Sequence, residues 1–273
     1  MRTLKIRKQL LFILSVIFAG TVLNAQERVK EVPTEGIVGY FSFDKTSGTD
    51  IICDKGIAIG KNGVITGASI SADSKRGKSL DINPEKGDSY VSFDKSNSKP
   101  FVFNGTMNMS VATWVKPRTL NKTRQTILSV NSIHGGNTYY LEISENNEFN
   151  AFISTVSVDG TKKYGNAYAK GLHHRLKLSA QDTWIHVAFT FNGASTKLYI
   201  NGELAIEETV KTPGNVIVPW SNQLYIGATR KDGKNITASQ FDGKIDELYF
   251  YNRALNVAEV KILMNSVDPI VAK

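Results

Sequence analysis

Residues 184–193 read Trp-Ile-His-Val-Ala-Phe-Thr-Phe-Asn-Gly, and residues 197–203 read Lys-Leu-Tyr-Ile-Asn-Gly-Glu. Apolar side chains recur at every second position in both stretches, which is the period of a β-strand, and the Asn-Gly pair between them is typical of a hairpin turn. We predict a register that pairs Thr190 with Lys197, because a slip by one residue would bury Lys197. This register places apolar side chains opposite each other on one face: Val187 with Ile200, and Phe189 with Leu198.

The second face of this hairpin is mixed and aromatic, unlike a plainly solvated face. It places Ala188 opposite Tyr199 and carries His186 beside them. With Trp114 and Trp184, these side chains are candidates either for stacking on a ligand or for packing. For the two tryptophans we favour packing residues of the fold, covered by a loop.

The rest of the chain from residue 36 onward consists of short apolar or alternating runs separated by Gly, Asn, Asp and Ser. Many strands without intervening helices predict an all-β protein, an antiparallel sandwich or barrel. One short helix is expected near the C-terminal end, where Asn256 is a candidate N-cap and Glu259 follows three residues later. The predicted strands are Ile37–Phe43, Tyr90–Phe93, Met109–Lys116, Thr126–Val130, Thr138–Ile143, Phe149–Ser154, Trp184–Phe191, Lys197–Ile200, Gln223–Ile226 and Lys244–Tyr251.

The first 25 residues have the order of a secretory signal peptide. Four basic residues come first, an apolar run from Leu10 to Ala19 follows, and Leu23-Asn24-Ala25 provides a small residue for cleavage. This run is too short to span a bilayer, which takes about 20 residues, and no second run of that length follows. We predict a signal peptide at 1–25, a polar leader at 26–35, one domain at 36–265 and a tail at 266–273.

Charge and cysteine content exclude several classes of protein. The chain of 273 residues carries a formal charge of +8, but residues 1–25 hold four basic residues and no acidic ones, so the mature charge is +4. A single cysteine, Cys53, excludes an intramolecular disulfide and a zinc site built from cysteines. The composition is that of a globular chain rather than a disordered one.

Residues 184–203 resemble the central hairpin of laminin G-like domains of the concanavalin A-like lectin/glucanase superfamily. Four further segments agree in order along the chain, and the resemblance covers roughly residues 36–265: Gly39–Asp44, Ser110–Pro117, Leu224–Gly227 and Phe241–Leu255. The resemblance implies a jelly-roll sandwich of two antiparallel sheets, one of them concave. Related domains bind glycans, bind proteins, pack against catalytic domains or hydrolyse glucans, so the site residues must decide the function.

The carboxylate pattern of the glucan-hydrolysing relatives is absent. Those enzymes carry Glu-x-Asp-x-(x)-Glu on one strand, because a retaining mechanism needs an acid and a nucleophile about 5 Å apart. Asp246 and Glu247 are adjacent, so we expect them on opposite faces of a strand, and Glu142 and Glu145 are three apart. Nucleophile-elbow, zincin and P-loop motifs are also missing. We therefore expect no enzymatic activity, with a glycoside hydrolase as the minority alternative.

A structural calcium ion is the cofactor that the resemblance implies, because many relatives hold one where the first and closing strands meet. Asp44 ends the opening motif, Asp246 lies in the closing motif, and a carbonyl near Gly77 is the third ligand that the resemblance implies. Calcium takes six to eight oxygens, so carbonyls and water would complete the site. The alternative is that Asp44 caps a turn and Asp246 pairs with Arg253.

The candidate ligand-binding residues combine aromatic rings with a histidine. They are Trp220, Tyr139, Tyr140, His134 and Tyr199. Sugars present flat C–H patches that stack on such rings, while polar side chains bond their hydroxyls. We predict that Trp220 and Tyr139 lie nearer a ligand than Trp184, because loops carry recognition on a rigid scaffold. A Trp220 folded over the sandwich edge is the alternative.

A basic stretch at residues 162–177 holds lysines, histidines and an arginine. We favour a solvated loop. The alternative is that this stretch binds an anionic glycan or an acidic protein surface. The export signal argues against nucleic acid as a partner.

From these features we predict a secreted, non-catalytic carbohydrate-binding or adhesion module in the periplasm or at the cell surface of a Gram-negative bacterium. Its partner would be a glycan or a cell-surface protein, with no membrane span after signal removal. The alternative is a protein-interaction or structural module of the cell envelope.

Overall fold

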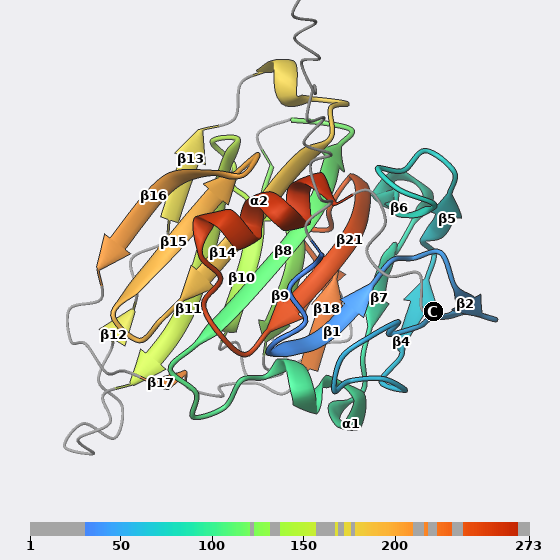
Figure 1. Cartoon of the computed structure of the whole chain (residues 1–273). Coiled ribbons are helices and arrows are strands. Elements are labelled where there is room, and N and C mark those ends of the chain that lie inside the picture. Colours follow the sequence, from blue (N-terminus) through green and yellow to red (C-terminus); the bar gives the residue numbers. More distant parts are fainter. Residues whose placement is uncertain are drawn as a thin grey trace, which may run out of the picture.

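The computed structural model describes residues 31–120, 123–131, 137–156, 167–168, 172–175, 178–209, 216–217, 223–230 and 237–266. Two antiparallel sheets pack face to face, as Figure 1 shows, and a short helix, α2 (Val257–Asn265), lies across the outer face of the front sheet. This is the jelly-roll sandwich that the sequence predicts.

The first sheet has the strand order β16-β15-β14-β8-β21-β6-β5, with β1 also paired to β21. Its strands are β1 (Ile37–Phe41), β5 (Ser69–Ser71), β6 (Ser79–Ile82), β8 (Met109–Pro117), β14 (Ile185–Phe191), β15 (Ser195–Ile200), β16 (Glu203–Thr209) and β21 (Gly243–Tyr251).

The second sheet has the order β12-β11-β10-β9-β18-β7-β4-β3-β2, with β13 and β17 also paired to β11. Its strands are β2 (Thr46–Ser47), β3 (Asp50–Ile51), β4 (Gly63–Thr66), β7 (Tyr90–Ser92), β9 (Gln125–Asn131), β10 (Asn137–Ile143), β11 (Glu148–Val156), β12 (Ala167–Tyr168), β13 (Leu172–Arg175), β17 (Val216–Ile217) and β18 (Gln223–Ile226). The remaining elements are α1 (Lys95–Ser98), the 3-10 helices η1 (Pro84–Lys86), η2 (Lys99–Phe101) and η3 (Leu178–Ala180), and a small hairpin of β19 (Thr229–Arg230) and β20 (Thr237–Ala238).

The hairpin of β14 and β15 has the predicted register, with Thr190 opposite Lys197 and Phe189 opposite Leu198. Val187, Phe189 and Leu198 are buried in the core between the sheets. The apolar face of the hairpin therefore points inward, because only this register removes all of its large side chains from water.

The core between the sheets is rich in phenylalanine. Phe41 packs edge-on against Phe93, with ring centroids 5.6 Å apart, and Phe101 lies 4.8 Å from Phe250. The first strand is two residues shorter than predicted, since Phe43 has φ +60° and cannot continue the extended backbone. Its side chain still enters the core.

A second, smaller core fills the space between the first sheet and α2. The helix begins with the predicted capping box, in which the Asn256 side chain accepts a hydrogen bond from the Glu259 amide and Glu259 returns one to the Asn256 amide. Val260 and Leu263 are buried against the sheet beside Tyr199. Among the described residues, no helix is long and apolar enough to cross a membrane.

The strands that the sequence did not predict are short or polar. They are β2 to β6, β12, β13, β16, β17, β19 and β20. In β16 the side chains are mostly exposed or half-buried, so the strand has no buried apolar face that would mark it in the sequence.

Candidate functional site

The outer face of the first sheet is closed by α2 and holds a buried ionic network. Its centre is a bulge in β21 between Asp246 and Tyr249, where Glu247 has φ +54°. The Glu247 carboxylate accepts hydrogen bonds from the Tyr40 hydroxyl at 2.8 Å, the Tyr249 hydroxyl at 3.1 Å and the Arg76 guanidinium at 2.8 Å. Because of the bulge, Asp246 and Glu247 both bond to groups of this outer side, so the prediction that they lie on opposite faces is wrong.

Burial sets the proton affinities in this network. It raises the pKa of the Glu247 carboxyl, while Arg76 acts in the opposite direction. Burial likewise raises the pKa values of the Tyr40 and Tyr249 hydroxyls. The Arg76 guanidinium also donates to the carbonyls of Leu263 and Met264 at the end of α2, so it ties the helix to the bulge. The network is therefore structural, because it holds α2 against the bulge of β21.

The two predicted calcium ligands both contact the loop 73–78. The Asp246 carboxylate accepts hydrogen bonds from the Lys75 and Arg76 amides at 2.8 and 2.9 Å, and its other oxygen accepts one from the Glu247 amide. The Asp44 carboxylate accepts one from the Lys78 amide at 2.6 Å.

Gly77 has φ +56°, and a Cβ atom there would lie 2.0 Å from Asp44 Oδ1. The glycine is therefore needed for the close approach of the loop to Asp44.

These donors do not fit a calcium ion. Burial raises the pKa of the Asp246 carboxyl to about 8, and three backbone N–H groups act in the opposite direction. Amide hydrogens directed at a carboxylate occupy positions where an ion needs further oxygens. Among the described residues, no group of three or more acidic, histidine or cysteine side chains is arranged to hold a metal. The surroundings of Asp44 and Asp246 fit an amide cradle better than the calcium site that the resemblance implies, and melts with and without calcium decide between the two.

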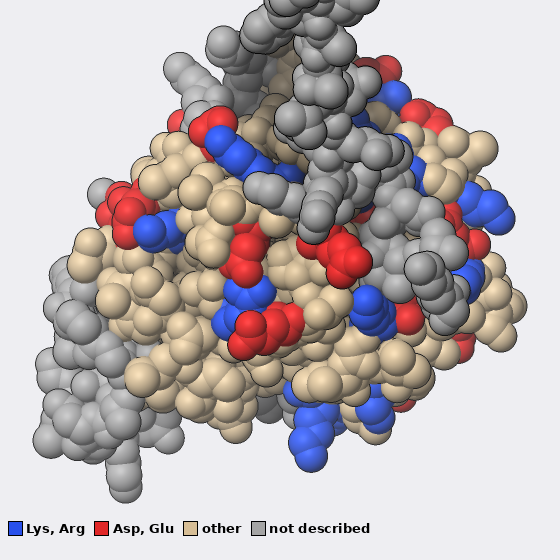
Figure 2. Space-filling model, viewed as in Figure 1, with Lys and Arg blue, Asp and Glu red and all other residues tan. Residues whose placement is uncertain are grey.

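The structure does not show the ion pair between Asp246 and Arg253 that the sequence offers as an alternative, so that prediction is wrong. Arg253 pairs instead with Glu259 of α2, at 2.7 Å. Around this helix, basic and acidic side chains are interspersed, with no extended patch of one sign in the view of Figure 2. The described side chains visible there form no single-sign patch that would select a polyanion.

The predicted ligand-binding aromatic residues separate into three groups. Tyr139 is fully buried between the sheets, where its hydroxyl donates to the Phe101 carbonyl at 2.6 Å, so the prediction that it lies near a ligand is wrong. Tyr199 is buried in the small core beneath α2 and is not available to a ligand either. Trp220 and His134 lie outside the described residues.

Tyr140 is the predicted residue that the structure leaves half-buried on an outer face. It stacks on Phe152 of the neighbouring strand, with ring centroids 5.0 Å apart and an interplanar angle of 13°. Asn150 donates to the Glu142 carboxylate at 3.0 Å and contacts the Tyr140 hydroxyl at 3.4 Å. Arg124 lies 3.6 Å from Glu142. We name these five residues the Tyr140 patch.

The Tyr140 patch lies on the outer face of the second sheet. Cross-strand pairing continues this face from Tyr140 to Ser129 of β9 and then to Tyr225 of β18. Tyr225 has Tyr90 beside it, 6.4 Å between ring centroids. The face is thus a row of aromatic and small polar side chains across several strands.

Within the patch, Glu142 and Asn150 are buried, Tyr140 and Phe152 are half-buried, and Arg124 is exposed. Burial raises the pKa of the Glu142 carboxyl, and Arg124 and Asn150 act in the opposite direction. Arg124 also lies 3.6 Å from Glu145, so it bridges the two carboxylates, Glu142 and Glu145, that are three positions apart in the sequence. Phe152, Asn150 and Arg124 were not predicted as site residues, because only strand pairing reveals that they surround Tyr140.

Residues 85–261 match the family model of the concanavalin A-like lectin/glucanases superfamily, which is more than half of the chain. The chain belongs to this superfamily. The structural comparison agrees, and a search of curated protein sequences finds no match.

Several solved structures share this concanavalin A-like fold at low sequence identity. The binding domain of botulinum neurotoxin DC, solved in complex with rat synaptotagmin II, has a TM-score of 0.59 and 16% identity, over 86% of this chain and 52% of that one. The binding domain of Paraclostridial Mosquitocidal Protein 1 has a TM-score of 0.59 and 17% identity, over 85% and 52%. The chain thus spans about half the length of these two binding domains.

A third similar structure is matched over almost its whole length. Domain 4 of AbnA, a GH43 extracellular arabinanase from Geobacillus stearothermophilus in complex with arabinotriose, has a TM-score of 0.53 and 21% identity, over 84% of this chain and 98% of that one. At these identities the likeness establishes the fold, while the ligand must be argued from the side chains.

Proposed function

We propose that the chain is an exported, non-catalytic carbohydrate-binding module, and that the Tyr140 patch is its ligand face. The observation that supports this most is the stacked pair of Tyr140 and Phe152 beside an amide, a carboxylate and a guanidinium. Aromatic rings bind the C–H face of a sugar, and the exposed Arg124 guanidinium can bond its hydroxyls, while the buried Glu142 and Asn150 position Arg124 and Tyr140. The arabinotriose complex of a similar domain agrees with this proposal.

The patch supports binding rather than hydrolysis. Glu142 is held by Asn150 and lies near Arg124, and Arg124 also bridges to Glu145. A retaining glycosidase needs one free nucleophilic carboxylate and one proton donor at the scissile bond. Pairing of both carboxylates with one guanidinium opposes that division of roles.

The second candidate is a protein-interaction module of the cell envelope. The binding domain of botulinum neurotoxin DC, about half of which resembles this chain, was solved in complex with rat synaptotagmin II, a protein partner. On either proposal the chain is exported through residues 1–25, retains no membrane span and does not bind nucleic acid.

A glycan array followed by titration calorimetry tests the carbohydrate proposal, with arabino-oligosaccharides included. Arg124→Ala and Tyr140→Ala should each weaken binding of the best array ligand about fivefold or more, since one stacking or charged contact contributes on the order of 1 kcal/mol. Val64→Ser, an exposed position on another strand of the same sheet, is the matched control and should bind like the wild type. Absence of binding to every glycan on the array would reject the proposal. Wild-type affinity in both patch variants would reject it as well.

A further inference from the structure

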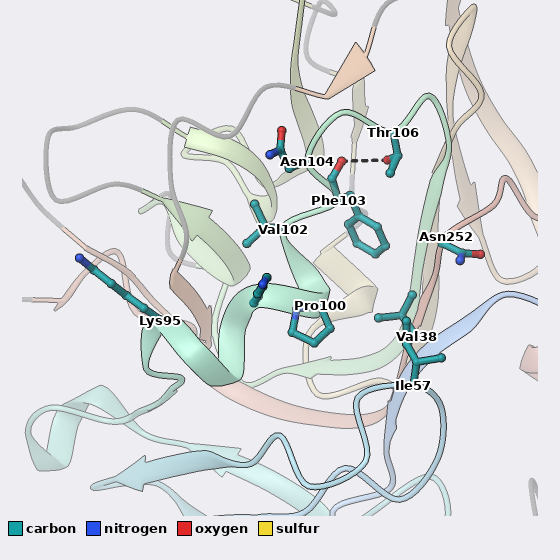
Figure 3. Close-up of a pocket in the computed structure, with 10 residues that line it drawn as sticks. Val38, Ile57, Lys95, Pro100, Val102, Phe103, Asn104, Thr106 and Asn252 are labelled. Atoms are coloured by element: carbon teal, nitrogen blue, oxygen red, sulfur yellow. Dashed lines mark hydrogen bonds between the residues drawn. The ribbon is translucent and has the colours of Figure 1, made fainter.

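A groove between β1 and η2 has no role in the proposal above. We name it the Phe103 groove; it has a volume of about 510 Å³. Val38, Pro100, Val102 and Phe103 provide its apolar lining. Figure 3 shows Val38 and Ile57 on one side of it, Pro100 and Phe103 between, and Lys95 on the other side. Its volume lies in the range of known ligand sites.

Ile57 extends this apolar surface into solvent. It is 75% exposed, and Ile59, two residues later, is 66% exposed. Between them Ala58 is fully buried, and its amide donates to the Val38 carbonyl at 2.8 Å. The two isoleucines are therefore held outward by an anchored loop, and neighbouring exposed apolar side chains of this kind mark an interaction surface.

The backbone around the groove is pre-organised. At Gly56, with φ +106°, a Cβ atom would lie 2.5 Å from the Val38 carbonyl, so the loop lies directly on β1. On the facing side, the Phe103 carbonyl accepts hydrogen bonds from the Thr106 amide and hydroxyl, at 3.1 and 2.8 Å. A ligand would find both walls already formed, which lowers the cost of binding.

Charge complementarity identifies the chemistry of the partner. Lys95 and Lys99, one helical turn apart, line the groove, and within the described part of the chain neither has an ion-pair partner. Exposed amide side chains of Asn104 and Asn252 line it as well. Two unpaired cations select a partner with acidic groups, and the apolar lining selects aliphatic side chains.

The amides distinguish a peptide from other anionic partners. A peptide backbone offers a donor and an acceptor at each residue, which Asn104 and Asn252 can satisfy, whereas an acyl chain offers neither. Phe103 is buried, so no open ring face is presented to a sugar. We propose that the Phe103 groove binds an extended peptide segment that carries an aliphatic side chain next to acidic residues.

Panning a displayed library of random dodecapeptides on the purified protein tests this proposal. Recovered peptides should share an aliphatic residue with Asp or Glu nearby. Synthetic copies, measured by fluorescence polarisation, should lose about tenfold or more in affinity for the Lys95→Glu/Lys99→Glu variant, equivalent to ~1.4 kcal/mol, and several-fold for Ile57→Ser. Their affinity should also fall with rising salt.

Matched controls are Lys86→Glu and Leu204→Ser, which are exposed and do not line the groove; both should keep wild-type affinity. Thermal melts confirm that every variant folds. Failure to recover any peptide would overturn the proposal. So would groove variants that bind the recovered peptides with wild-type affinity.

Two further results would replace the peptide with another occupant and so overturn the proposal. One is binding to phosphatidylcholine vesicles with phosphatidylserine that the lysine variant abolishes. The other is a concentration-dependent dimer in ultracentrifugation that the same variant abolishes. Glycan binding by the Tyr140 patch is a separate readout and should be unchanged in the groove variants.

Discussion

His186 illustrates at the scale of one residue how burial determines chemistry. Its ring lies edge-on to Trp114, with centroids 5.3 Å apart, and its Nδ1 atom has no hydrogen-bond partner among the described residues. Burial, helped by the charge of Arg76, lowers the pKa of His186 to about 3. The imidazole is therefore neutral at neutral pH and acts as a packing group. Lys75 covers the other ring, with its ammonium 4.2 Å from the centre of Trp114.

The lowered pKa of His186 predicts a pH-dependent contribution to stability. The unfolded chain takes up a proton near pH 6.5 and the folded chain only near pH 3, so this contribution is present above about pH 6.5 and is lost as the pH falls toward about 3. Between pH 6.5 and 5, the unfolding free energy of the wild type should fall relative to that of His186→Phe, with a slope of up to ~1.4 kcal/mol per pH unit. Urea unfolding at several pH values measures the unfolding free energies of both proteins. A difference between them that does not change with pH would contradict the prediction.

At the scale of an element, the loop 73–78 joins distant parts of the first sheet. Its amides bind Asp44 and Asp246, and its Arg76 side chain binds Glu247 and the end of α2. Backbone N–H groups thus bind the two carboxylates that the resemblance assigns to an ion site. They satisfy both carboxylates where the loop packs beside the small core.

Thermal melts in calcium and in a chelator decide between these two accounts of the loop. Calcium bound only to the folded state would raise the unfolding free energy by ~2.7 kcal/mol at a hundredfold excess over its dissociation constant. Because the described donors around Asp246 are amides, we expect equal melting temperatures in both buffers. A rise with calcium that Asp246→Asn abolishes would instead establish the ion site.

At the scale of the whole molecule, the two sheets assign opposite roles to neighbouring residues. Tyr139 points between the sheets and Tyr140 points outward, because side chains alternate along β10. The inner residue therefore contributes to the core, and the outer one is available for recognition.

This division predicts different costs for two adjacent substitutions. Tyr139→Ala removes a fully buried ring and should lower the unfolding free energy by ~3–5 kcal/mol. Tyr140→Ala, at a half-buried position, should cost about 1–2 kcal/mol, including the lost contact with Phe152. Chemical denaturation of both variants measures the costs, and a Tyr140 variant as unstable as the Tyr139 variant would show that both rings are structural.

Local patterns in the sequence determined the strands with one apolar face, the register of the β14–β15 hairpin and the capping box of α2. These features depend on residues close together in the chain, so period and turn chemistry reveal them. The order of the five motifs along the chain likewise indicated the family. The bulge at Glu247 is different, because nothing in a run of Asp and Glu shows where a ladder slips.

The candidate site also depended on the tertiary structure, because its residues lie on different strands. Alternation along β10 shows that Tyr139 and Tyr140 point opposite ways, but which of them faces the core depends on the sheet that packs against the strand. Phe152 and Arg124 join Tyr140 only through strand pairing and side-chain contact. The Phe103 groove likewise combines Val38, Ile57, residues 95–106 and Asn252, which are distant in sequence. Sequence thus determined which elements form, whereas packing between the sheets determined which side chains remain at the surface.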